Sequence, residues 1–170
     1  MKSILYIVAF CFCFGFAQSQ NRLKTLKFEG YELKYPETWI HKNFYGFILL
    51  VPREMEAAQK KGVQIKVYPN YLGSKLTGKS FKDYLVEHAE TKRTHEINTK
   101  YEISISDNKK FQYKIEYHYN LDFNEDNYKK VEYIKLEKST LKYYSFMAKV
   151  ELFDKYYYDA MLIINSIEKR

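Results

Sequence analysis

The sequence has 170 residues, a length that favours one domain with a substantial core. Its excess of basic over acidic residues, 28 against 21, is compatible with an anionic partner, although an AT-rich genome also enriches Lys, Asn, Ile, Tyr and Phe together. The only cysteines, Cys11 and Cys13, lie in a segment expected to be removed, which excludes disulfides, thiol nucleophiles and Cys-bound metals from the mature chain.

The amino-terminal segment has the three-part layout of a secretory signal peptide. Met1-Lys2 provides a positive start, Ile4 to Phe14 is almost wholly apolar, and Gly15-Phe16-Ala17 offers small residues at the cleavage site. A membrane anchor is the weaker interpretation, because the run is shorter than the roughly 20 residues needed to cross a bilayer. Lipidation of Cys13 is not favoured, since a lipoprotein signal needs a small residue where Phe12 stands.

Cleavage after Ala17 is therefore expected, leaving residues 18–170 as a single α+β domain. The mature protein should begin at Gln18, and its net charge should fall by the one lysine removed, to +6. Intact mass or amino-terminal sequencing of the exported protein checks this. Retention of Phe16, or a lipid mass on Cys13, would contradict it.

The first half of the mature chain contains short strands separated by turn residues. Alternation on both sides of Glu29-Gly30 predicts a hairpin, and prolines mark the expected strand ends. The predicted elements are strands at 26–28, 31–35, 44–51 and 63–67, a polar connection at 54–62 and a loop at 70–79.

A helix is predicted to open at Ser80, whose hydroxyl can cap the first turn together with Asp83. The helix should fade near Thr94. Its apolar positions recur at helical spacing and predict one buried stripe, formed by Phe81, Tyr84, Leu85 and His88.

The strongest pattern is a long alternation of apolar and polar residues in the second half. It predicts strands at 97–105, 111–123, 128–136 and 141–152, with a register that a one-residue slip would destroy. Asp154 can cap a final helix. The expected core stripe of that helix comprises Phe153, Tyr157, Ala160, Met161, Ile164 and Ile167.

These elements predict an α+β fold, in which an antiparallel β-sheet is packed by helices as an α/β/α sandwich. A closed all-β barrel is the alternative. It would leave the apolar stripe of the Ser80 helix without a surface to cover.

Two short motifs resemble those of PsbP-like proteins. The segment Gly30 to Trp39 contains the Tyr-Pro-x-x-Trp corner of that family, and Ile163 to Ile167 is similar to its Ile-x-x-Ser-Phe close, with Ile167 in place of Phe. The family includes the extrinsic photosystem II protein, a Ran-binding nuclear-transport factor and exported bacterial proteins. The resemblance implies an α/β/α sandwich that works by binding or assisting assembly, and it carries over no functional residue.

No motif for catalysis or cofactor binding is present, so we expect neither an enzyme nor a cofactor, although an enzyme without a local motif stays open. His88 and His95 are seven residues apart, too far along a helix to share one metal ion. A weak calcium site is conceivable at Asp122, Asn124 and Asp126, but an acidic turn explains these residues better, because the rest of a calcium loop is missing.

The leading hypothesis is an exported binding or assembly-assisting module with a protein partner in the cell envelope, periplasmic or secreted. A structural accessory subunit of an envelope complex is the alternative. Export argues against nucleic acid, no membrane span is expected after cleavage, and the oligomeric state is open. Tyr143 and Tyr158, together with Lys142, are candidates for an outward partner-binding surface, although codon bias also explains scattered tyrosines.

Overall fold

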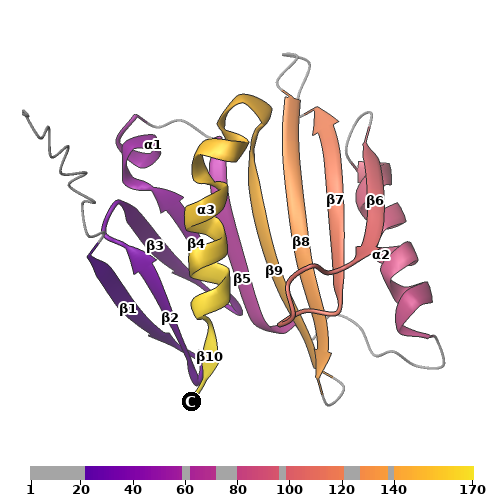
Figure 1. Ribbon diagram of the computed structural model, residues 1–170, viewed down its shortest axis with the longest axis horizontal. Helices are drawn as coiled ribbons and strands as arrows, with labels where there is room; N and C mark the ends of the chain where they lie inside the picture. Colours follow the sequence, from indigo (N-terminus) through magenta and orange to yellow (C-terminus); the bar gives the residue numbers. More distant parts are fainter. Residues whose placement is uncertain (1–21, 59–61, 72–79, 96–98, 121–126, 138–139) are drawn as a thin grey trace, which may run out of the picture.

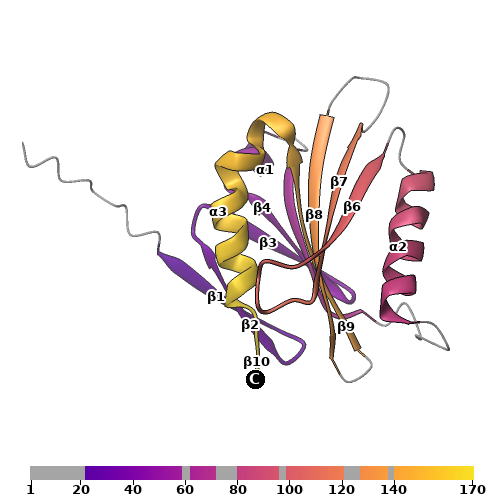
Figure 2. The same ribbon diagram turned by 45° about the vertical axis from the view of Figure 1, so that its right-hand side comes forward.

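A seven-stranded antiparallel sheet forms the centre of the molecule, with one long helix on each face (Figures 1 and 2). The computed structural model describes residues 22–58, 62–71, 80–95, 99–120, 127–137 and 140–170. The strands of the large sheet, in spatial order, are β3 (Trp39–Phe44), β4 (Phe47–Pro52), β5 (Val63–Tyr71), β9 (Thr140–Lys149), β8 (Asn127–Glu137), β7 (Tyr113–Asn120) and β6 (Lys100–Ile105).

A small sheet of three strands lies beside the large one. It comprises β1 (Leu23–Phe28), β2 (Tyr31–Pro36) and the two-residue β10 (Glu168–Lys169). The predicted hairpin at its start is confirmed, since Phe28 pairs with Tyr31. Glu29 and Gly30 both have positive φ, 46° and 79°, as a two-residue type I′ turn requires.

The last helix, α3 (Val150–Ser166), packs between the two sheets and closes the larger core. A short helix, α1 (Arg53–Ala57), is tied to it by the hydrogen bond from Lys155 to Glu54. The core on this face contains aliphatic and aromatic side chains from β2, β4, β5, β8, β9 and α3, among them Leu33, Leu50, Ile65, Val131, Phe146 and Ile163.

The opposite face is partly covered by α2 (Phe81–His95). The predicted cap is confirmed, because the Ser80 hydroxyl accepts a bond from the Asp83 amide at 3.2 Å and donates to its carboxylate at 2.6 Å. Leu85 is fully buried against the sheet, and the side chain of His88 is mostly buried, with 11% of its surface exposed. This second core also contains Ile115, Tyr117, Tyr119, Tyr128, Ile134, Leu141 and Tyr143.

The boundary between the last long strand and the last helix was predicted wrongly. The strand expected to reach Leu152 ends at Lys149, and α3 begins at Val150, four residues before the expected cap Asp154. Val150 and Leu152 fit either period, so alternation could not separate strand from helix here. The predicted stripe of α3 omitted Tyr156, which is buried, whereas Tyr157 is partly buried and packs against the core as expected.

Two further differences concern the first strands of the large sheet. The strand β3 was missed, because its residues mix polar and apolar types on both faces. Pro69 was expected to end its strand, but β5 continues to Tyr71 through an irregularity in the pairing with β9. A proline is tolerated at such a bulge, where its missing N–H costs no ladder bond. In the part of the chain that the structure describes, no helix combines the length and the apolar character needed to cross a membrane.

Candidate functional site

A carboxylate is buried in the middle of the sheet. Glu132 lies on β8 with 0% of its side chain exposed, on the face covered by α2. Neighbouring strands place Ser145 and Ile115 beside it in the register. A buried carboxylate is costly unless it is paired and hydrogen-bonded, so its partners determine what it can do.

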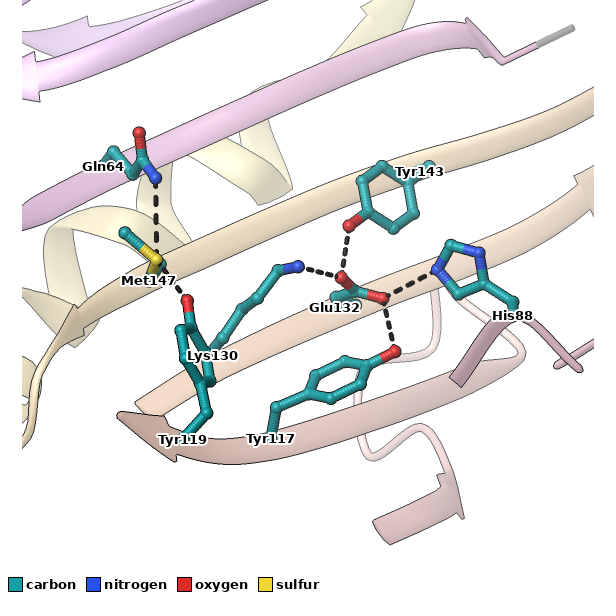
Figure 3. A network of polar contacts seen from close by, with 8 residues as sticks. All are labelled: Gln64, His88, Tyr117, Tyr119, Lys130, Glu132, Tyr143 and Met147. Carbon is teal, nitrogen blue, oxygen red and sulfur yellow. Dashed lines mark hydrogen bonds and ion pairs between the residues drawn. The ribbon is translucent and has the colours of Figure 1, made fainter. Parts of the chain in front are cut away.

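Four donors from four elements surround this carboxylate (Figure 3). Lys130 on the same strand places its Nζ 2.5 Å from Oε1, and the hydroxyl of Tyr143 on β9 donates to the same oxygen. Tyr117 on β7 donates to Oε2 at 3.0 Å. His88 on α2 places Nε2 3.1 Å from Oε2, and Nε2 must donate, because an ionised carboxylate only accepts. We call these five residues the Glu132 cluster.

The electrostatics of the Glu132 cluster keep its carboxylate ionised. Burial alone would raise the pKa of Glu132, but the charge of Lys130 and the bond from His88 outweigh burial and hold the pKa well below its usual range. Conversely, burial and the adjacent Glu132 charge raise the pKa of Tyr143 well above its ordinary value. Tyr143 therefore remains a protonated donor at neutral pH.

This arrangement suits anchoring better than catalysis. An efficient general base has a pKa near the working pH, whereas the pKa of Glu132 is lowered. Both oxygens of the carboxylate already accept hydrogen bonds, and the side chain has no exposed surface. The Glu132 cluster thus links α2 to three strands of the sheet. The bond from His88 is the contribution of the helix.

A row of aromatic rings leads from the Glu132 cluster to the surface. Its members, which we call the aromatic row, are Phe44, Phe47, Tyr68 and Tyr143, one from each of β3, β4, β5 and β9. Phe44 stacks on Phe47 with centroids 4.8 Å apart, and Phe47 stacks on Tyr68 at 4.9 Å. Tyr68 contacts Tyr143 at 5.2 Å. The row connects a buried polar centre with an edge of the sheet.

The outer end of the aromatic row is a hairpin tip that exposes two large side chains. Tyr45 at the turn between β3 and β4 is fully exposed, and Phe44 is 44% exposed. Gly46 takes the positive φ of 79° in this turn. The ring of Tyr45 contributes no burial to the fold, and exposed tyrosines are enriched where proteins meet partners.

The structure separates the three predicted partner-binding candidates. Tyr143 was expected to face outward, and this is wrong: it is 7% exposed and belongs to the Glu132 cluster. It does lie on the face opposite Tyr144, as alternation requires, but α2 covers that face too. Tyr158 on α3 is 76% exposed, as expected. Lys142 is mostly buried, pairing with Glu137 and contacting the ring of Tyr31 at 5.4 Å.

The histidines and the acidic residues considered as metal ligands are only partly covered by the structure. His118 is exposed, while the side chain of His95 is outside the described residues. The calcium candidates Asp122, Asn124 and Asp126 also lie outside them. Within the described ranges, no three His, Cys, Asp or Glu side chains are grouped so as to hold a metal ion.

Sequence reasoning missed the Glu132 cluster, although a signal was present. Lys130 and Glu132 occupy alternate positions between apolar residues of a long strand, on the side that also carries Tyr128 and Ile134. Charged residues at such positions predict either a solvated face or a paired buried group. Only knowledge that α2 covers this face decides between the two.

Helices on both faces of an antiparallel sheet, with an added hairpin beside the carboxy-terminal helix, form an α+β sandwich. The predicted fold class is confirmed. The solution structure of cyanobacterial PsbP (CyanoP) from Synechocystis sp. PCC 6803 is similar, with a TM-score of 0.56 and 14% identity. The match covers 88% of this chain and 94% of that chain. At this identity, the similarity concerns the fold.

Searches by sequence add no relative. No protein-family model matches the chain. No curated protein matches it either.

Proposed function

We propose that this chain is an exported, non-enzymatic protein-binding module of the cell envelope that binds its partner or assists its assembly. The observation that carries the proposal is the exposed aromatic hairpin tip, Phe44 and Tyr45. Tyr45 gains no burial from the fold where it stands, and Phe44 leaves 44% of its surface exposed. At an interface both rings would bury large area at low entropic cost.

Three further observations support this function. The buried polar group best suited to chemistry, Glu132, has no exposed surface, and its two oxygens are engaged by four donors. The PsbP-like fold is compatible with an accessory role, because the resemblance implies proteins that work by binding. The apolar leader at residues 4–14 supports export.

The predicted surface around Tyr158 stays a second candidate for the same function. Tyr158 is exposed on α3, and the hairpin tip lies on other elements of the fold. Lys142 is a weaker part of it, because it is already paired with Glu137. Tyr143 no longer belongs to this surface, since α2 and the sheet bury it.

Site-specific crosslinking in the envelope tests the proposal. A photoreactive phenylalanine analogue is placed at position 45, at position 158 and, as a control, at the exposed position of Asp154. We expect a discrete crosslinked product from position 45 and none from position 154. A product from position 158 alone would move the binding surface to α3. No product from positions 45 and 158 would contradict a binding function.

A further inference from the structure

The seven-stranded sheet is covered unequally on its two faces. On β4, Ile48 and Leu50 face α3 and are 1% and 0% exposed, whereas Phe47 and Leu49, which face the other way, are partly exposed. The helix on that other face, α2, lies over β6, β7 and β8, at the opposite end of the sheet from β3 and β4 (Figures 1 and 2). We call the partly exposed area the β3–β5 surface; it comprises Lys42, Phe44, Phe47, Leu49, Lys66 and Tyr68.

The β3–β5 surface continues without a break into the half that α2 covers. One row of directly paired residues runs from Lys42 through Leu49 and Lys66 to Ser145 and Glu132. The aromatic row runs parallel to it. In the covered half, the apolar face of a helix packs on this side of the sheet, since Phe81, Leu85 and Ala89 of α2 belong to the core there.

The charged side chains that β3, β4 and β5 themselves contribute to the β3–β5 surface have one sign. Lys42 and Lys66 occupy its central row, and no carboxylate occupies a position on this face of β3, β4 or β5. Glu56 of α1 pairs with Lys42 at 2.6 Å, but both side chains are more than 40% exposed. Exposed pairs of this kind are weak and exchange readily with a competing carboxylate. A partner with acidic side chains beside an apolar stripe would complement this surface.

We propose that the β3–β5 surface is the docking site for an amphipathic helix with acidic flanks, supplied by a protein partner and lying beside α2 on the same face. The inference rests on the proposed binding function and names the chemistry of the partner. A strand of six residues such as β4 spans about 20 Å at roughly 3.3 Å per residue. A helix covering it needs about 13 residues, since each adds about 1.5 Å.

Two synthetic helices serve as probes. Both are cross-linked peptides of about 14 residues, a length that is marginally helical without such a staple. They share one stripe of leucines and differ in flanks of glutamate or lysine. Fluorescence anisotropy gives their affinities for the full mature chain, and amide chemical shifts locate the bound peptide. We expect the glutamate peptide to bind at least about tenfold more tightly, with shifts confined to β3, β4 and β5.

Matched variants separate the surface from general stickiness. Leu49→Glu should weaken the glutamate peptide at least about tenfold. Lys66→Glu should reverse the preference between the peptides, and Lys42→Glu, on the exposed edge strand, repeats that test if Lys66→Glu fails to fold. Tyr158→Ser on α3 should change neither affinity.

Several outcomes would overturn the inference. Equal affinity for the two peptides, shifts outside β3–β5, or charge reversals without effect would each do so. So would a concentration-dependent dimer whose interface shields Leu49, or binding of anionic vesicles at this surface in place of the peptide. If position 45 gives a crosslink in the envelope and any of these results is also found, the proposed binding function is retained. Only the inference that the partner supplies an acidic amphipathic helix is then rejected.

Discussion

Replacing Glu132 with alanine should lower the free energy of unfolding by about 3–5 kcal/mol, because the change leaves the buried ammonium of Lys130 without its carboxylate. The hydroxyls of Tyr117 and Tyr143 and the ring of His88 also lose their acceptor. Urea unfolding of the mature protein, followed by circular dichroism, measures the loss.

Glu116 provides a matched control on the neighbouring strand. It also pairs with two lysines, Lys114 at 2.9 Å and Lys129 at 3.2 Å, but it is partly exposed on the other face. Glu116→Ala should therefore cost less than about 1 kcal/mol. Similar losses of unfolding free energy for both variants would show that burial does not strengthen the contribution of the Glu132 ion pairs to stability.

The stability difference between the wild type and Glu132→Gln should depend on pH in a defined direction. The pKa of Glu132 is lowered in the folded protein, while an unfolded glutamate titrates near about 4.3. The contribution of the carboxylate is thus fully present above that unfolded value and is lost as the pH falls toward the folded pKa. A difference that grew on acidification below about pH 4 would contradict this assignment.

Replacing Trp39 with alanine should cost about 3–5 kcal/mol, as truncation of a large buried aromatic side chain does. Trp39 is 1% exposed at the start of β3 and packs edge-on against Tyr156 of α3, with ring centroids 6.0 Å apart. Its indole N–H donates to Asp159 at 3.0 Å. The side chain therefore joins the sheet to α3 by both packing and a hydrogen bond.

Trp39→Phe separates these two contributions. It keeps an aromatic ring in the core and removes only the indole donor to Asp159. Its loss of unfolding free energy should therefore be smaller than that of Trp39→Ala. Denaturant melts of both variants measure the two losses. A loss below about 1 kcal/mol for Trp39→Ala would show that the ring is not part of the core in solution.

Burial of the aromatic residues illustrates how far local patterns reach. Trp39, the large apolar residue of the Tyr-Pro-x-x-Trp corner, is buried, as its size and apolar character predict. Tyr143 and Tyr144 point to opposite faces of the sheet, as alternation requires of adjacent strand residues. The predicted outward position of Tyr143 was wrong, since alternation assigns a side chain to a face without stating what covers that face.

The sequence by itself determined the α+β class, the long antiparallel strands and the cap of α2, because each follows from local periodicity or a short hydrogen-bonding motif. Only the tertiary structure decided that α2 covers β6 to β8 and leaves the β3–β5 surface partly exposed. It also decided that Glu132, His88 and Tyr143 meet, since these residues come from β8, α2 and β9 and are brought together only by packing. A charged residue in an alternating strand can face water or lie buried among hydrogen-bond donors, and the sequence pattern of the strand is the same in both cases. Only the layer that covers the strand decides between the two.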